Sequence, residues 1–368
     1  MMRNSKVALL TGFPSGLIAR RLLNKLLVAQ RDIRVLCLTP ESSLRRAQEL
    51  LAALSEPDKQ RVELLRGSVA AMDFGLSGAR FLALAKEVDI IHHCAAIDHP
   101  GVSRHLTERI NVNGTGEVLE LAALSTGLQQ FVYWSTAFVA GARRGLVMED
   151  ELIRTPSFRN LVEETRFRAE KIVRHAMSRV PTVILRPAIV VGDAESWHID
   201  RLNGPYLLLK FILNAPFEMT IPLPQKGEFL LNQVPVGYVV DAAVAIANDP
   251  RSVGRCFHLV DPNPPRIRDI CLATAKLARR PLTIGELPSG LANVLLQAPG
   301  IKQLSDIPRT YLDQLSSDVA YNRTNTRELL QGTSIECPNV TSYLQPLVDY
   351  LRSAKNVSAD QDEENPGV

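Results

Sequence analysis

The stretch VALLTGFPSGLIARRLL, residues 7–23, decides the fold of this chain. A short apolar run ends in a turn that contains Gly12 and Gly16, and a segment with a helical apolar face follows at once. A dinucleotide pyrophosphate binds at such a strand–turn–helix, because the N–H groups and the dipole at the helix start both favour anions. We expect Gly12 to allow the tight turn, Gly16 to let the backbone approach the ligand, and Ala19 to pack against the strand. The spacing G-x-x-x-G-x-x-A differs from the G-x-G-x-x-G fingerprint, so an ordinary βα turn remains the alternative.

Strand-like and helix-like segments alternate outward from this stretch. Apolar strands are expected at 6–12, 33–39, 62–67, 88–96, 130–137 and 182–192, and helices at 16–30, 42–54, 106–127 and 157–179. This alternation predicts an α/β fold with a Rossmann-like, doubly wound parallel sheet covered by helices on both faces. After residue 192 the regularity weakens, with a further strand and helix expected at 229–249 and a strand at 255–261.

These segments predict a two-domain organisation. A dinucleotide-binding domain covers residues 1–192, and the chain returns to it at about 229–249. A smaller C-terminal substrate domain takes up most of 193–354, and the polar tail 355–368 is expected to be disordered.

Composition narrows the functional classes. The 368 residues are 46% hydrophobic and 22% charged with a net charge of +3, which gives no sign of a nucleic-acid partner. The five cysteines are scattered without metal-ligand spacing, which favours reduced thiols, a cytoplasmic location and no metal site. No apolar run approaches the ~18 residues of a transmembrane helix, and the N-terminus has no signal-peptide pattern.

An ordered set of further segments covers roughly residues 6–265. They are TGFPSGLIARRLL, FGLSGARFLALAKEVDIIHHCAA, NVNGTGEVLELA, FVYWSTAFVAG, TRFRAEKIV, VILRPAIVVGD, GPYLLLKFI, PVGYVVDAAVAIA and FHLVDPNP. In this order they resemble the extended short-chain dehydrogenase/reductase superfamily, nearest the branch of fatty acyl reductases and carrier-protein thioester reductases.

The resemblance implies roles for matching positions. Cofactor contacts would come from Gly12, Phe13, Pro14, Ser15, Gly16, Leu17 and Ile18 at the pyrophosphate, Cys94, Ala95 and Ala96 near the adenosine, and Pro187, Ala188 and Ile189 near the nicotinamide. Thr136 matches the hydroxyl that polarises a substrate carbonyl, with Ser135 as a second candidate, and Asn111 opens the next helix near the site. An ordinary strand-end hydrogen-bonding pair is the alternative for Ser135 and Thr136.

The resemblance breaks at the catalytic pair of the superfamily. Its acid tyrosine and the lysine four residues further on correspond here to Val162 and Arg166, and the downstream AEKIV supports this register. Valine has no proton to give to an alkoxide. Arginine keeps the positive charge of the lysine but does not deprotonate, so it cannot join a proton relay.

Other residues are candidate replacements for this pair. Tyr206 and Lys210 form the only Y-x-x-x-K of the chain, but they follow the sixth strand in an apolar segment, so we expect the match to be accidental. His92, His93, Asp98 and His99 lie at or beyond the end of the fourth strand, where a histidine can act as acid or base. Histidines satisfied by packing are the alternative, and Tyr133 on the fifth strand is expected in the core.

The second strand leads into the cofactor-selecting segment CLTPESSLRR, residues 37–46. Glu41 offers a partner for a ribose hydroxyl, and Arg45 or Arg46 offers one for a 2′-phosphate. We predict NADP with Arg45 as its contact, and NAD remains an alternative. The aspartate that the superfamily places beside the adenine is Ser68 here.

Three functions follow from these residues. The first is an NAD(P)-dependent oxidoreductase acting on the carbonyl of an acyl-chain or acyl-thioester substrate, free or tethered to a carrier protein. The second is a non-redox lyase or dehydratase in a tailoring biosynthetic pathway, and the third is a non-catalytic binding protein. The apolar GPYLLLKFILNAP, residues 204–216, is a candidate wall for an acyl chain, with a core helix as the alternative. The sequence leaves the oligomeric state open, and a homodimer is one candidate.

Overall fold

The computed structural model describes residues 5–99, 101–153, 157–192, 205–214, 219–286 and 318–353. Its centre is a seven-stranded sheet in which every neighbouring pair is parallel. In spatial order the strands are β11 (Cys256–Leu259), β7 (Thr182–Pro187), β5 (Gln130–Trp134), β4 (Ile90–His93), β1 (Lys6–Thr11), β2 (Ile33–Thr39) and β3 (Val62–Arg66). The predicted Rossmann-like sheet is confirmed. The tail 355–368 lies outside the described residues.

The direction in which successive strands are added reverses between β1 and β4. From β1 the chain adds β2 and β3 toward one edge of the sheet, and from β4 it adds β5, β7 and β11 toward the other. In doubly wound sheets ligands bind at this switch point, beyond the carboxyl ends of the strands. The turn after β1 and the segment after β4 therefore meet at the ligand-binding edge.

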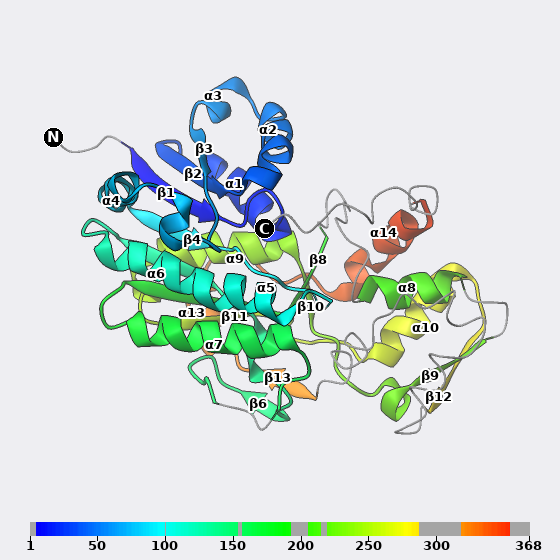
Figure 1. Ribbon diagram of the computed structural model, residues 1–368. Coiled ribbons are helices and arrows are strands. Elements are labelled where there is room, and N and C mark those ends of the chain that lie inside the picture. Colours follow the sequence, from blue (N-terminus) through cyan, green and yellow to red (C-terminus); the bar gives the residue numbers. More distant parts are fainter. Residues whose placement is uncertain are drawn as a thin grey trace.

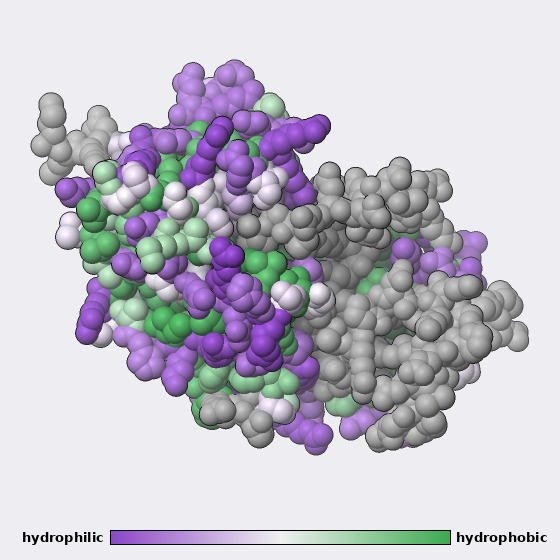
Figure 2. Space-filling model, in the orientation of Figure 1, coloured by the Kyte–Doolittle hydropathy of each residue, from purple (hydrophilic) through white to green (hydrophobic). Residues whose placement is uncertain are grey.

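Helices cover both faces of the sheet (Figure 1). One face carries α1 (Leu17–Ala29), α2 (Leu44–Ala52), α9 (Val236–Asn248) and α13 (Thr324–Leu330). The other carries α4 (Gly78–Glu87), α6 (Gly114–Leu124) and α7 (Leu161–Ala176). Residues of β1 alternate between the two cores, with Ala8 and Leu10 in the first and Val7 and Leu9 in the second. Two short helices, α3 (Glu56–Lys59) and α5 (Arg104–Glu108), complete this part, and Figure 2 shows a mainly hydrophilic surface over α2 and α3.

A second, smaller core lies beside the sheet. It contains α8 (Pro205–Asn214), α10 (Ile267–Ala278) and α14 (Val340–Ser353), with the parallel pair β9 (Met219–Leu223) and β12 (Leu282–Glu286) at its edge (Figure 1). The apolar segment around 205–214 is thus a helix whose Leu208, Leu209 and Ile212 are buried in this core.

The chain returns to the sheet domain further than the predicted 229–249. After β10 (Gln233–Pro235) and α9, strand β11 pairs with β7 at the edge of the main sheet. Later, β13 (Val319–Tyr321) pairs with β6 (Gly145–Val147), and α13 packs against α9 and β11. Sequence periodicity could not show these pairings, because the partners lie far apart along the chain.

Two expected elements are broken in the structure. The strand expected at 182–192 divides at Ala188, whose N–H still bonds Leu259 O at 3.1 Å, whereas Ile189 N–H bonds Asn232 O at 3.2 Å. The chain thereby leaves β11, and β8 (Ile189–Val191) pairs with β10 instead. The helix expected at 106–127 is interrupted by a π-helical turn at Arg109–Asn113.

Candidate active site

A pocket of about 320 Å³ opens at the carboxyl ends of β1, β4, β5 and β7. Among the predicted site residues, its walls contain Gly12, Phe13, Ser15, Gly16, Leu17, Ile18, Cys94, Ala95, Ala96, Ser135, Thr136, Arg166, Pro187 and Ile189. The pocket runs from the α1 N-terminus to the first turns of α7. One cavity thus joins the predicted phosphate turn to the predicted carbonyl-polarising hydroxyl.

The turn after β1 is shaped to present backbone N–H groups. Gly16 is the N-cap of α1 and provides no side-chain hydrogen bond, so the amides of the first turn face the pocket without a side-chain cap. Gly12 adopts φ +88°, a conformation that favours glycine, and accepts a bond from Gly16 N at 2.8 Å. These features suit an anion at the helix start.

Replacing Gly12 by alanine should destabilise the protein. A Cβ there would come within 2.9 Å of both Ala95 N and Cys94 C, and the positive φ adds strain. We expect a loss of about 1–3 kcal/mol in the free energy of unfolding, measured by urea denaturation. Gly78→Ala is the matched control, because a Cβ there meets nothing within 4 Å. Equal effects from the two substitutions would contradict the role given to this turn.

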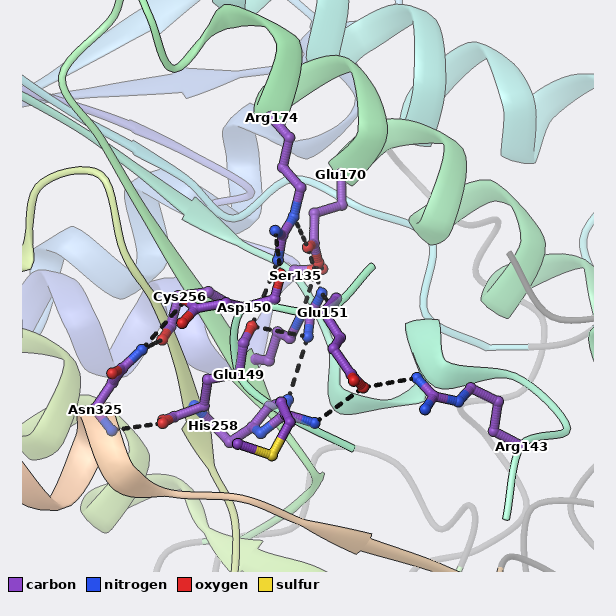
Figure 3. Close-up of polar contacts among 12 residues, drawn as sticks. Ser135, Arg143, Glu149, Asp150, Glu151, Glu170, Arg174, Cys256, His258 and Asn325 are labelled. Atoms are coloured by element: carbon purple, nitrogen blue, oxygen red, sulfur yellow. Dashed lines mark hydrogen bonds and ion pairs between the residues drawn. The ribbon is translucent and has the colours of Figure 1, made fainter. Parts of the chain in front are cut away.

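The two predicted hydroxyls differ in their surroundings. Ser135 Oγ donates to Glu170 Oε2 at 2.6 Å, inside a buried polar network drawn in Figure 3. Thr136 is half-buried, and its Oγ1 makes only long contacts, a donation to Pro187 O at 3.4 Å and an acceptance from Phe138 N at 3.3 Å. The Ser135 hydrogen is committed to a carboxylate, whereas the Thr136 hydroxyl can turn toward a ligand.

The α7 pair lines the same pocket. Val162 and Arg166 both contribute to its wall, one helical turn apart. The Arg166 guanidinium donates to Trp134 O and lies 5.6 Å from the centre of the Tyr133 ring. Its other N–H groups have no hydrogen-bond partner among the described residues, and they are the donors available to a ligand.

Three predicted residues do not line the pocket. Both ends of the Asn111 amide are already hydrogen-bonded. Its oxygen accepts from Ile97 N at 2.7 Å, and its nitrogen donates to Thr165 Oγ1 at 3.0 Å. Asn111 therefore positions the segment after β4 against α7. Arg45 is 93% exposed and pairs with Glu49. The Pro14 carbonyl accepts from Arg20 at 2.9 Å.

The histidines considered as acids divide into two groups. His92 and His93 are buried in β4 and do not line the pocket. Burial lowers the pKa of His92 to about 4, and burial with the Arg166 charge lowers the pKa of His93 to about 3, so both are neutral at physiological pH. Asp98 and His99 do line the pocket, and Asp98 is exposed at its rim.

Sequence reasoning missed part of the pocket wall. The residues not assigned there are Leu38, Pro40, Gly67, Val69, Ile97, Trp134, Phe138, Glu163, Val190, Gly192 and Tyr206. Tyr206, expected to be an accidental Y-x-x-x-K match, is buried in this wall, and its phenol oxygen accepts from Gly192 N. The sign of this position in the sequence is the Y-x-x-x-K that Tyr206 forms with Lys210.

The residues present fit a nicotinamide dinucleotide. The α1 N-terminus offers amide donors for a pyrophosphate, and the spare Arg166 donors suit the hydroxyls of a ribose. Gly67 and Ser68, after β3, line the pocket where the adenosine of a cofactor lying across the switch point would be.

Comparison with known proteins agrees with this geometry. The profile of the family described as male sterility protein, an NAD-binding family, matches residues 10–243. A linear gramicidin synthase subunit of Brevibacillus parabrevis is 26% identical over 389 residues, covering 98% of this chain and 7% of that protein. Fatty acyl-CoA reductase 1 of Gallus gallus is 27% identical over 297 residues, covering 67% of this chain and 56% of that protein.

A solved structure resembles the whole chain. The terminal R domain from the myxalamid PKS-NRPS biosynthetic pathway superposes with a TM-score of 0.81 and 26% identity, covering 98% of this chain and 93% of that one. By contrast, the chain spans only 7% and 56% of the two curated relatives above. Within the described residues, no helix is both long and apolar enough to cross a membrane.

Proposed function

Because the chain belongs to the male sterility protein family, in the fatty acyl and thioester reductase branch of the extended short-chain dehydrogenases/reductases, we propose that it is an NADPH-dependent reductase of acyl thioesters. The observation that carries the proposal is one continuous pocket from the uncapped α1 N-terminus to Thr136 and Arg166. A cofactor whose pyrophosphate is bound at the α1 N-terminus would bring its hydride to a carbonyl held beside Thr136 and Arg166.

The proposed reaction consumes one hydride and one proton. A bound reduced nicotinamide would supply the hydride that the carbonyl carbon takes up. The resulting alkoxide takes a proton and becomes a hemithioacetal. The C–S bond then breaks, the thiolate takes the hydroxyl proton, and the products are an aldehyde and a free thiol.

The chain's own residues would bind and orient the reactants. The backbone amides of Leu17 and Ile18 would hold the pyrophosphate, and Arg166 would hold the ribose. Thr136 Oγ1 would donate to the carbonyl oxygen and hold it facing the hydride. The apolar wall formed by Ile189, Val190 and Phe138 would exclude water from the reacting carbon.

The substrate is proposed to be an acyl chain carried on a phosphopantetheine-type thiol, as a coenzyme A ester or on a carrier protein. The chicken relative is named for fatty acyl-CoA, and the Brevibacillus relative is a subunit of linear gramicidin synthase. The pocket wall is largely apolar and includes Leu17, Ile18, Phe138, Ile189 and Val190. This arrangement supports an apolar acyl group in preference to a polar one.

Preference for NADP over NAD is proposed to depend on Arg45 and Arg46, which start α2 beside the pocket-lining Pro40. The Arg45 pair with Glu49 is exposed and therefore weak, so the guanidinium can turn to a 2′-phosphate. Replacing both arginines by alanine should raise the Kd for NADPH about tenfold and leave the Kd for NADH unchanged. Calorimetry with both cofactors checks this, and Lys59→Ala on the neighbouring α3 is the control. Equal losses for the two cofactors would contradict it.

The function is tested by incubating the purified protein with NADPH and decanoyl-CoA. Three products are followed together: NADPH loss, free thiol and decanal. Equal amounts of the three support the reductase. Absence of NADPH binding up to millimolar concentration would sink it.

One observation favours a non-redox alternative. Val162 cannot donate a proton and Arg166 retains a positive charge, and this pair suits polarisation of a carbonyl for proton transfer at the adjacent carbon. Such a lyase would convert a 3-hydroxyacyl thioester to the unsaturated thioester without NADPH loss, so hydroxydecanoyl-CoA in the same assay distinguishes it.

A further inference from the structure

We infer that Ser135 is a positioning residue for Thr136 and that Glu170 on α7 is its anchor. This rests on the proposed reductase function, in which the Thr136 hydroxyl orients the carbonyl. The Glu170 carboxylate accepts from Ser135 Oγ at 2.6 Å, and Figure 3 shows the Glu170 side chain reaching from its helix toward Ser135. Thr136 is the next residue of the chain, so this bond ends directly before the carbonyl-orienting hydroxyl.

The Thr136 hydroxyl is not fixed by its own hydrogen bonds. Its donation to Pro187 O spans 3.4 Å and its acceptance from Phe138 N spans 3.3 Å, and both distances exceed the usual range. The place of the hydroxyl therefore depends on the backbone that leads to it. A donor has to lie about 2.7–3.1 Å from the oxygen that becomes negative, so a small shift of this backbone would weaken the bond when the charge develops.

Helix α7 holds that backbone at two successive residues. The Arg166 guanidinium donates to Trp134 O at the end of β5, and Glu170 accepts from the side chain of Ser135. Arg166 and Glu170 are four residues apart, so the same face of the helix provides both bonds. On the neighbouring strand β7, Leu185 O accepts from Ser135 N at 2.7 Å. The end of β5 is thus held by the helix and by the sheet.

Glu170 is a rigid anchor. Its carboxylate is fully buried and accepts from Arg186 Nη2 at 2.6 Å and from Arg186 Nε at 3.0 Å. Arg174 Nε donates to it at 2.9 Å. Arg186 belongs to β7, so the carboxylate is fixed between the helix and the sheet. A hydrogen bond to a carboxylate is about twice as strong as one between neutral groups, which makes Ser135 a firm point of attachment.

Ser135 also lines the pocket, which raises the question of whether it donates to the carbonyl itself. Its hydrogen would first have to leave the Glu170 carboxylate, although the serine is only 3% exposed and water cannot replace the lost bond. The Thr136 hydroxyl can turn toward a ligand without such a loss. The geometry therefore assigns the contact with the substrate to Thr136 and the positioning of Thr136 to Ser135.

Ser135→Ala removes the attachment and leaves Thr136 in place. We expect kcat with decanoyl-CoA and NADPH to fall about tenfold. The KM for the thioester and the Kd for NADPH should stay unchanged, because the bond to the carbonyl strengthens only as charge develops. Ser252→Ala is the matched control, since Ser252 is a buried serine outside the pocket whose Oγ accepts from Gln130. It should lower the stability to urea and leave kcat unchanged.

A double-mutant comparison separates positioning from a general disturbance of the site. Thr136→Ala alone should lower kcat about 100-fold, as the loss of a donor to a developing oxyanion does. Adding Ser135→Ala to Thr136→Ala should then leave kcat unchanged, because Ser135 acts through the hydroxyl that is already gone. If the two losses multiply, Ser135 acts on the reaction in another way and the inference is wrong.

Ser135→Cys serves if the alanine variant does not fold. It keeps nearly the same size and replaces the hydroxyl by a weak donor, so kcat should fall, but less than in an alanine variant. Full kcat in Ser135→Ala or in Ser135→Cys would overturn the positioning role while the reductase function stands. Wild-type protein that binds no NADPH and forms no decanal would overturn the reductase function and the positioning role with it.

Discussion

Val162→Tyr combined with Arg166→Lys should raise reductase activity by about 10²–10⁴. Both positions line the pocket from the same face of α7, so the new phenol and ammonium would meet the carbonyl and the ribose. Measuring kcat for NADPH consumption with decanoyl-CoA in the wild type and in the double variant checks this.

The control for this exchange is Val162→Phe with Arg166→Lys. It adds the ring without the hydroxyl, so any gain from filling space or from the lysine alone appears in it. If the tyrosine and phenylalanine versions have the same kcat, proton donation does not limit this protein.

Glu170→Ala should destabilise the protein by about 3–5 kcal/mol. The Glu170 carboxylate is fully buried and accepts from Arg186 Nη2 at 2.6 Å. It also accepts from Arg174 Nε at 2.9 Å (Figure 3). Arg186 is itself fully buried, so the substitution leaves a guanidinium without its counter-charge. Domains have about 5–15 kcal/mol of stability, so a large part would be lost. Urea unfolding followed by circular dichroism measures the change.

An exposed ion pair provides the control. Glu328 pairs with Arg255 at 2.7 Å, but Glu328 is 46% exposed, so Glu328→Ala should change the midpoint little. Similar urea midpoints for Glu170→Ala and Glu328→Ala would contradict the large contribution to stability expected of Glu170.

The same carboxylate predicts a pH dependence. Burial raises the pKa of Glu170, but Arg186, Arg174 and the Ser135 hydroxyl outweigh it and lower the pKa from 4.5 to about 2. A pKa lowered in the folded state stabilises the fold above the ordinary value, and this stabilisation disappears as the pH falls from about 4.5 toward 2. The difference between wild type and Glu170→Ala should therefore shrink over that window.

The parts of the fold that follow local pattern could be predicted. The strand–turn–helix at residues 6–29 depends on neighbouring residues alone, and the structure has it as β1 and α1. The family likeness is likewise visible, because ordered segments carry it, and the match over residues 10–243 confirms it.

The side-chain partners could not be predicted. Ser135 lies beside Thr136 in sequence, but its direction is decided by Glu170 on α7. Asn111 is drawn away by Ile97 and Thr165, and the position of Tyr206 depends on how α8 packs against the end of β8. Such long-range contacts leave no periodic signal in a single sequence.

The late return of the chain to the sheet has a consequence for synthesis on the ribosome. The edge of β7 stays open until β11, ending at Leu259, has left the exit tunnel, and α13, which covers β11, follows only at residues 324–330. The Glu149 carboxylate accepts from the amides of Asn325 and Thr326, so it lacks these two partners until α13 has been made. The nascent dinucleotide-binding half thus exposes a strand edge from the completion of β7 at Pro187 until β11 is made at Cys256–Leu259, an interval in which this edge is open to pairing with another chain.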